Sequence, residues 1–122
     1  MAECQIKLTK TMLEKSIIDA NLSVRRLSKG LKGLDIDYDK MKCGEKHKVG
    51  AVIWLRSNRK IESEVRFYRA NNARGDRRIS IKNARKHFEV GDTLTLKARN
   101  IGHGCFVNGI VIYRNLKEKV RA

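Results

Sequence analysis

Hydrophobic residues recur at helical spacing in the first quarter of the chain. Five apolar residues at spacings of 4, 3, 4 and 3 would lie on one face of an α-helix: Leu13, Ile17, Ala20, Val24 and Leu27. Thr11 followed by Glu14 fits a capping box, and Gly30 suits the end of such a helix. The pattern leaves open whether the helix runs to Leu27 or breaks near Asn21, a residue that prefers helix caps to helix interiors.

After Gly33 the period changes to two, which is typical of half-buried β-strands. Leu34, Ile36 and Tyr38 alternate with aspartates and predict a strand there. Similar patterns predict strands over residues 49–55, 61–69, 79–82, 93–99 and 105–113. Residues 83–88 are a candidate for one helical turn, and Val90-Gly91-Asp92 is a turn signal.

Five to seven short strands and one clear helix predict a mainly β protein of the α+β class, with one or two helices. A small open β-barrel is favoured over a sandwich, because barrel closure protects strand edges in a short chain. The sequence has no proline, linker or repeat, so residues 1–122 are expected to form a single domain, with 117–122 as the candidate for a frayed tail.

Composition narrows the compartment and the class of protein. The 122 residues are 41% hydrophobic, and no apolar run approaches the ~18 residues of a transmembrane span. The N-terminal sequence lacks the apolar region of a signal peptide. We therefore expect a cytoplasmic protein of a prokaryote or phage, or a nuclear one if eukaryotic, with no membrane partner. Free thiols are expected at Cys4, Cys43 and Cys105.

Positive charge is concentrated in one segment. The chain has 28 Lys and Arg against 13 Asp and Glu, a net charge of +15, and residues 56–86 hold eleven of these cations against three acidic residues. Eight of the eleven are arginines, whose planar fork matches phosphate or a guanine edge. An excess of one sign repels itself unless a polyanion is bound. Nucleic acid is therefore the expected partner.

The centre of this basic segment is residues 73–80, Ala-Arg-Gly-Asp-Arg-Arg-Ile-Ser. Its one acidic residue, Asp76, stands among Arg74, Arg77 and Arg78. Asp76 has two compatible roles: it orients the arginines through salt bridges, or it accepts a hydrogen bond from cytosine N4 while an arginine contacts guanine.

The same segment resembles the DNA-binding pseudobarrel family of the EcoRII restriction endonuclease N-terminal domain, which shares its fold with the plant B-three transcription-factor domain. The similar residues are an aromatic strand, an asparagine loop and the basic motif: Phe67, Tyr68, Asn71, Asn72, Arg74, Asp76, Arg77, Arg78, Ile79 and Ser80. Residues 8–15 are similar to the family's strand followed by a helix, and residues 88–92 to a late turn.

The resemblance implies two arms that grip the major groove of DNA. By position, it implies base contacts for Arg74, Asp76 and Arg78, and phosphate contacts for Arg77 and Lys82. The N-terminal arm departs from the family, since only residues 1–6 precede the expected first strand. That arm is either shortened or formed by residues 7–10 and 28–32.

We therefore expect a duplex DNA-binding module, as in the recognition domain of a restriction endonuclease, with a fused or separate nuclease as a second candidate partner. The expected DNA-binding residues are Arg66, Arg69, Asn71, Asn72, Arg74, Asp76, Arg77, Arg78, Lys82, Lys7 and Lys10. No catalytic residue, metal or cofactor is expected.

Two other functions stay open: a small basic nuclease, and an RNA-targeting toxin or RNA-binding protein. A metal-dependent nuclease needs a Glu-x-Lys sequence on one strand, but after Glu64 the position of the lysine is occupied by Arg66. Cys43 with His47, and His103 with Cys105, do not have the spacing of a strong zinc site. Against single-stranded RNA, Tyr68 is the one good stacking candidate beside the basic loop.

Overall fold

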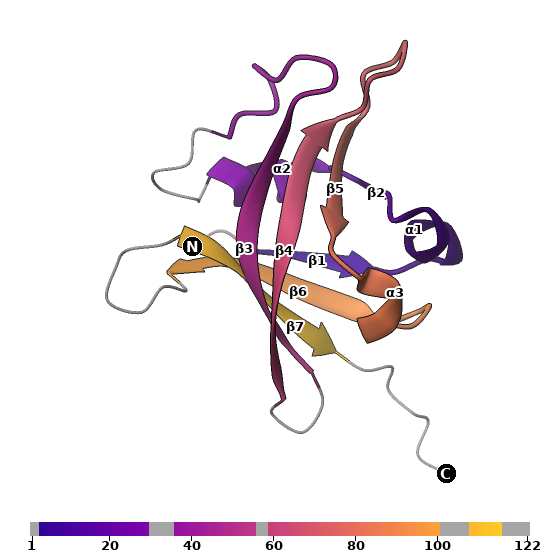
Figure 1. Cartoon of the computed structure of the whole chain (residues 1–122), viewed down its shortest axis with the longest axis vertical. Helices are drawn as coiled ribbons and strands as arrows, with labels where there is room; N and C mark the ends of the chain where they lie inside the picture. Colours follow the sequence, from indigo (N-terminus) through magenta and orange to yellow (C-terminus); the bar gives the residue numbers. More distant parts are fainter. Residues whose placement is uncertain (1–2, 30–35, 56–58, 101–107, 116–122) are drawn as a thin grey trace.

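The computed structural model describes residues 3–29, 36–55, 59–100 and 108–115. Within these ranges the chain forms seven strands and three short helices (Figure 1). The strands are β1 (Glu3–Lys7), β2 (Ile18–Asp19), β3 (Lys46–Trp54), β4 (Lys60–Arg69), β5 (Arg77–Ile81), β6 (Thr93–Asn100) and β7 (Asn108–Asn115). The helices are α1 (Lys10–Lys15), α2 (Leu22–Lys29) and α3 (Ala84–His87).

All seven strands belong to one sheet, in the order β1-β6-β7-β3-β4-β5-β2. Neighbouring strands are antiparallel except for β3 and β7, which run parallel. The sheet coils strongly, so that β3, β4 and β5 run upright in Figure 1 while β1, β6 and β7 cross them. The prediction of a mainly β protein with a small open barrel is confirmed.

The core fills the concave side of this sheet. In β4, Val65 and Phe67 are fully buried, whereas Arg66 and Tyr68 alternate with them on the outer face. The same alternation contributes inward residues from the other long strands: Ile53, Ile79, Leu94, Leu96, Ile110 and Ile112. α2 packs against β1 and β6, and buries Val24 and Leu27 in the same cluster. The outer face of β3, β4 and β5 is therefore left for polar side chains.

The N-terminal segment with helical periodicity forms two short helices separated by a short strand. Thr9 rather than Thr11 caps α1, because its hydroxyl accepts the N–H of Met12 at 3.2 Å. The helix ends at Ser16, whose φ of 53° is left-handed. The chain then pairs as β2 with β5 before Asn21 caps α2 by accepting the N–H of Val24. The break near Asn21 is the correct alternative, and the number of helices in the described part rises to three.

Two further boundaries differ from the prediction. The first strand begins at Glu3, earlier than expected, and pairs with β6. The strand predicted over residues 34–38 is wrong in its described part, because Ile36 and Asp37 have no regular structure and Tyr38 begins a turn. Asp37 there accepts the N–H of Asp39 at 3.0 Å, a local bond that competes with strand pairing. Leu34, residues 105–107 and residues 117–122 lie outside the described ranges.

The predicted turn at Val90-Gly91-Asp92 is confirmed, and a buried ion pair holds it. The Asp92 carboxylate accepts the N–H of Glu89 at 2.8 Å and the Arg114 Nε at 2.7 Å. The turn also bonds to the segment after β1, through Leu8 N–H to Asp92 O and Gly91 N–H to Leu8 O. None of the helices in the described part has the length and apolar character needed to span a membrane.

Candidate nucleic-acid interface

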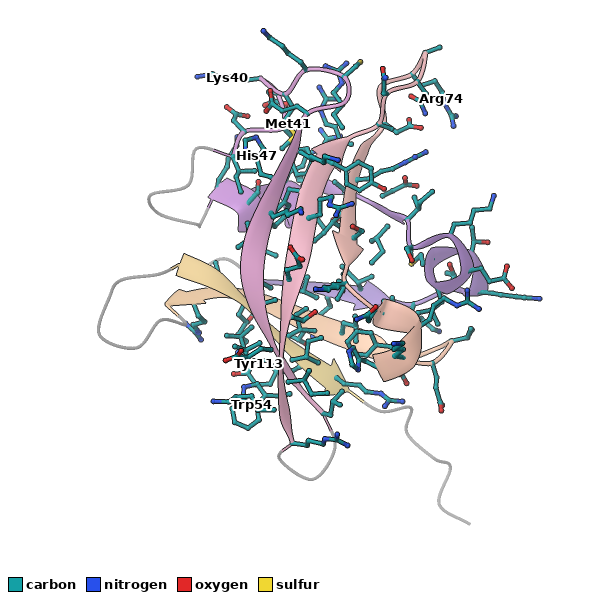
Figure 2. All side chains as sticks on the ribbon, viewed as in Figure 1. Lys40, Met41, His47, Trp54, Arg74 and Tyr113 are labelled. Atoms are coloured by element: carbon teal, nitrogen blue, oxygen red, sulfur yellow. The ribbon has the colours of Figure 1, made fainter. Side chains whose placement is uncertain are left out.

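The β4–β5 hairpin carries the motif that the sequence singled out. Arg69 and Arg77 are the last register partners of its two strands, and the loop between them closes with a bond from Ala70 N–H to Asp76 O. Within the loop, the Asn72 side-chain oxygen accepts the N–H of Gly75 at 2.7 Å. Figure 2 shows Arg74 at the tip of this hairpin, at the end of the molecule opposite Trp54 and Tyr113. The hairpin is thus a closed, hydrogen-bonded projection.

Arg69 fixes the base of the hairpin. Its Nε donates to Gly75 O at 3.0 Å, and its Nη1 donates to Met41 O at 2.7 Å in the segment before β3. Gly75 has a φ of 59°, and a Cβ at this position would lie 2.7 Å from Arg69 Nε. Glycine is therefore required here both by the backbone conformation and by the close guanidinium.

Arg77 makes a parallel link to the same preceding segment. Its Nε donates to Tyr38 O at 3.1 Å, while the Tyr38 hydroxyl donates to Arg78 O at 2.7 Å. Burial raises the pKa of the Tyr38 phenol. The Tyr38 side chain packs edge-on against Phe67 in the core. Arg69 and Arg77 thus both donate hydrogen bonds that position the hairpin against residues 38–41.

Asp76 lies at the centre of a cluster of donors. Its carboxylate is 3.1 Å from Arg78 Nη2, 3.4 Å from Arg74 Nη2 and 3.5 Å from Asn72 Nδ2. The Arg74 side chain is 82% exposed, whereas that of Arg78 is 19% exposed. Asp76 therefore orients one arginine that projects into solvent and one that lies along the sheet.

A basic groove lies beside the hairpin on the outer face of β3, β4 and β5, with a volume of about 580 Å³. Five cations and no acidic residue line it: Lys15, Lys46, Arg66, Arg69 and Arg78. Tyr68, Asn71, Asn72, Ser16 and Ser80 also line it. The Nε atoms of Arg66 and Arg78 are buried and donate to no acceptor in the described protein. The groove thus concentrates positive charge in one concave surface.

A second groove of about 450 Å³ lies on the other side of Lys15 and Arg78, which line both. Its walls carry Arg25, Arg74 and Arg77, but also the carboxylates of Asp19 and Asp76. The mixture of signs makes this second groove a weaker site for a polyanion than the basic groove.

The structure brings most of the expected residues together. Arg66, Arg69, Asn71, Asn72 and Arg78 line the basic groove, and Arg74, Asp76 and Arg77 line the second. Lys82 follows β5, and its ammonium lies 3.7 Å from the Glu64 carboxylate.

Lys7 and Lys10 line neither groove, and Lys10 lies 3.8 Å from Glu14 on the exposed side of α1. Residue 28, expected in an N-terminal arm, is a buried serine that donates to Arg25 O, and 30–32 lie outside the described ranges.

Sequence reasoning missed several cations on this face. Lys46 and Lys48 are the register partners of Tyr68 and Arg66, and β3 begins three residues before the predicted strand. Lys15 comes from the last turn of α1. The alternation of Lys46 and Lys48 around His47 was the available signal for a strand starting earlier.

The described residues offer little for catalysis or metal binding. They contain no group of three or more His, Cys, Asp or Glu side chains that could hold a metal ion. His47 Nε2 lies 2.8 Å from Glu45, and this hydrogen bond lowers the pKa of the Glu45 carboxyl. Cys43 is an exposed free thiol near His47 in sequence, while His103 and Cys105 lie outside the described ranges.

No protein-family model matches the chain, and neither the curated proteins nor the solved structures include a significant match.

Proposed function

We propose that the chain is a duplex DNA-binding module that grips the sugar-phosphate backbone with the basic groove and reads bases with the β4–β5 hairpin. The observation that carries the proposal is that five cations and no acidic residue line the basic groove. Arg66 adds weight, because no described acidic residue pairs with its guanidinium and its Nε is buried without an acceptor. Phosphate oxygens would supply acceptors for the guanidinium groups that line the groove.

The resemblance to the EcoRII and B-three pseudobarrel supports the same function. The motif residues lie on a strand, a projecting loop and a second strand, followed by α3 and a turn, in the order that the resemblance implies. Lys15 and Ser16, at the end of α1, line the groove together with residues of the hairpin. We assign the B-three-like fold as part of this proposal.

The surroundings of Asp76 in the hairpin favour one of its two candidate roles. Its carboxylate already meets three donors, so we assign it to orienting Arg74 and Arg78 rather than to contacting cytosine. Arg74, with its exposed side chain at the tip, is the principal base-contacting candidate. Arg69 and Arg77 position the hairpin through backbone carbonyls.

Selection from randomised duplexes, followed by affinity measurements over a range of salt concentrations, tests this function. We expect an enriched sequence, and Arg74→Ala should lose about 1–3 kcal/mol of binding free energy on it while relaxing preference at one base pair. Lys82→Ala is the comparison variant, which should weaken binding to all duplexes alike. An equal loss on every sequence for Arg74→Ala would contradict its base contact, and cleavage upon Mg²⁺ addition would favour the nuclease.

A further inference from the structure

Tyr68 has a position in the basic groove that packing does not explain. It lies on the outer face of β4, half-buried, between Lys46 of β3 and Arg78 of β5, its register partners on either side. No hydrogen bond joins its hydroxyl to another described residue. An aromatic ring between two cations on an open face is the arrangement on which a nucleobase can stack.

The two arginines with unused Nε atoms lie next to this ring. Arg66 is the register partner of Ser80, so Arg66 and Arg78 are diagonal neighbours on one face of the β4–β5 pair. Diagonal neighbours in an antiparallel pair are about 7–8 Å apart, within reach of one phosphate group for side chains as long as arginine. Both Nε atoms are buried without an acceptor in the described protein.

The rim of the groove adds groups suited to the edge of a base. Asn71 lines the groove, and no hydrogen bond joins its amide to another described residue. Asn72 differs, because its oxygen and nitrogen are both used within the hairpin. Ser80 adds a hydroxyl on the wall formed by β5. A backbone phosphate alone would leave Tyr68, Asn71 and Ser80 without a ligand.

We propose that the basic groove holds one unstacked nucleotide, with its base on the Tyr68 ring and its phosphate between Arg66 and Arg78. This inference rests on the proposed DNA-binding function and names the unit that the groove takes. The nucleotide comes either from a single strand or from a duplex by extrusion of one base. Extrusion costs least where the base is mismatched or bulged, so such a duplex should bind best.

Fluorescence anisotropy tests the proposal with three DNA probes. They are the duplex selected above, the same duplex with one central mismatch or bulge, and its single strand. We expect the mismatched or bulged duplex to bind about tenfold more tightly than the matched one, in line with the energy of one base–aromatic stack. 2-Aminopurine, placed at the mismatched or bulged position, should gain fluorescence on binding, because the base leaves the stack.

The outcomes of these measurements identify the source of the nucleotide and show which of the two proposals fails. Tighter binding of the bulged duplex than of the single strand identifies extrusion, whereas tightest binding of the single strand identifies an unpaired strand as the source. Binding with equal affinities for matched and bulged duplexes, and with unchanged 2-aminopurine fluorescence, overturns the nucleotide site and leaves backbone binding standing. Absence of binding to every DNA overturns the proposed function itself.

Variants at Tyr68 distinguish stacking from a general loss of the fold. Tyr68→Leu should abolish the tenfold preference while affinity for the matched duplex changes by less than about threefold, and Tyr68→Phe should restore the preference because it keeps the ring. Tyr113→Leu is the matched control, because Tyr113 is 37% exposed and lies far from the hairpin tip (Figure 2). Equal effects of the Tyr68 and Tyr113 substitutions would overturn the role of Tyr68.

Discussion

Arg69 and Arg74 are neighbours in the same hairpin, yet the structure gives them opposite surroundings. Arg69 donates to two backbone carbonyls, those of Gly75 and Met41, whereas the Arg74 side chain is mostly in solvent. We expect Arg69→Met to lower the free energy of unfolding by about 1.5–3 kcal/mol, the range for hydrogen bonds to charged groups. Arg74→Met should change it by less than about 0.5 kcal/mol. Urea denaturation of both variants checks the difference, and equal stabilities would contradict the positioning role of Arg69.

The ion pair between Asp92 and Arg114 is a second single-residue test, this time of the fold. The Asp92 side chain is 4% exposed and that of Arg114 is 17% exposed. Removing one partner of a buried pair leaves the other charge unpaired, so Asp92→Asn or Arg114→Met should each cost about 3–5 kcal/mol. In a double-mutant cycle, the two substitutions together should cost clearly less than their sum. Additive losses would show that the pair does not couple the turn to β7.

At the scale of elements, α3 confers a pH dependence. Burial lowers the pKa of His87 below its ordinary value of 6.5, and the positive charges of Lys86 and Arg59 lower it further. The unfolded chain therefore binds a proton at His87 more readily than the folded chain does, and stability falls as the pH drops below about 6.5. We expect the urea midpoint of the wild type to fall more steeply than that of His87→Gln between about pH 7.5 and about pH 5. Parallel profiles for the two proteins would contradict a depressed pKa.

The elements also show what hydrophobic periodicity can predict. Alternation located β3, β4, β5 and β6 to within three residues at each end, because one face of each strand is buried and the other is polar. Helical periodicity was misleading between Leu13 and Leu27, because Ile18 and Ala20 face the core from an extended segment that pairs with β5. A two-residue strand contains too few residues to have a period, and long-range pairing rather than local propensity decides its structure.

For the whole molecule, the charge count along the chain found the hairpin but not the complete groove. Lys15 and Lys46 reach it from α1 and β3, which are distant in sequence and are brought together by the order of strands and the position of α1. Lys7 and Lys10, expected from the N-terminal arm that the resemblance implies, line neither groove. A sum over a segment cannot tell which face of a strand a side chain occupies. Strand register supplies that information.

The distinction between the two sets of lysines can be measured as a salt effect of the whole molecule. Lys15→Ala with Lys46→Ala removes two cations that line the basic groove, so the slope of log Kobs against log salt concentration should become less negative by about 2. Lys7→Ala with Lys10→Ala removes the same net charge from surface outside the grooves. We expect this control to leave the slope nearly unchanged, and equal changes would mean that net charge rather than the groove determines affinity.

The position of β7 has a consequence for how the chain is made. β7 lies between β6 and β3, so the β1–β6 pair is joined to the β3–β4–β5–β2 group only through the last strand described. Until residues 108–115 emerge from the ribosome, the nascent chain has two separate partial sheets, and β3 and β6 each present an unpaired edge that can capture another strand. Because the joining contacts are long-range, completion of the sheet should be slow. A nascent chain of this protein is thus most exposed to aggregation in the interval before β7 has emerged and paired with β3 and β6.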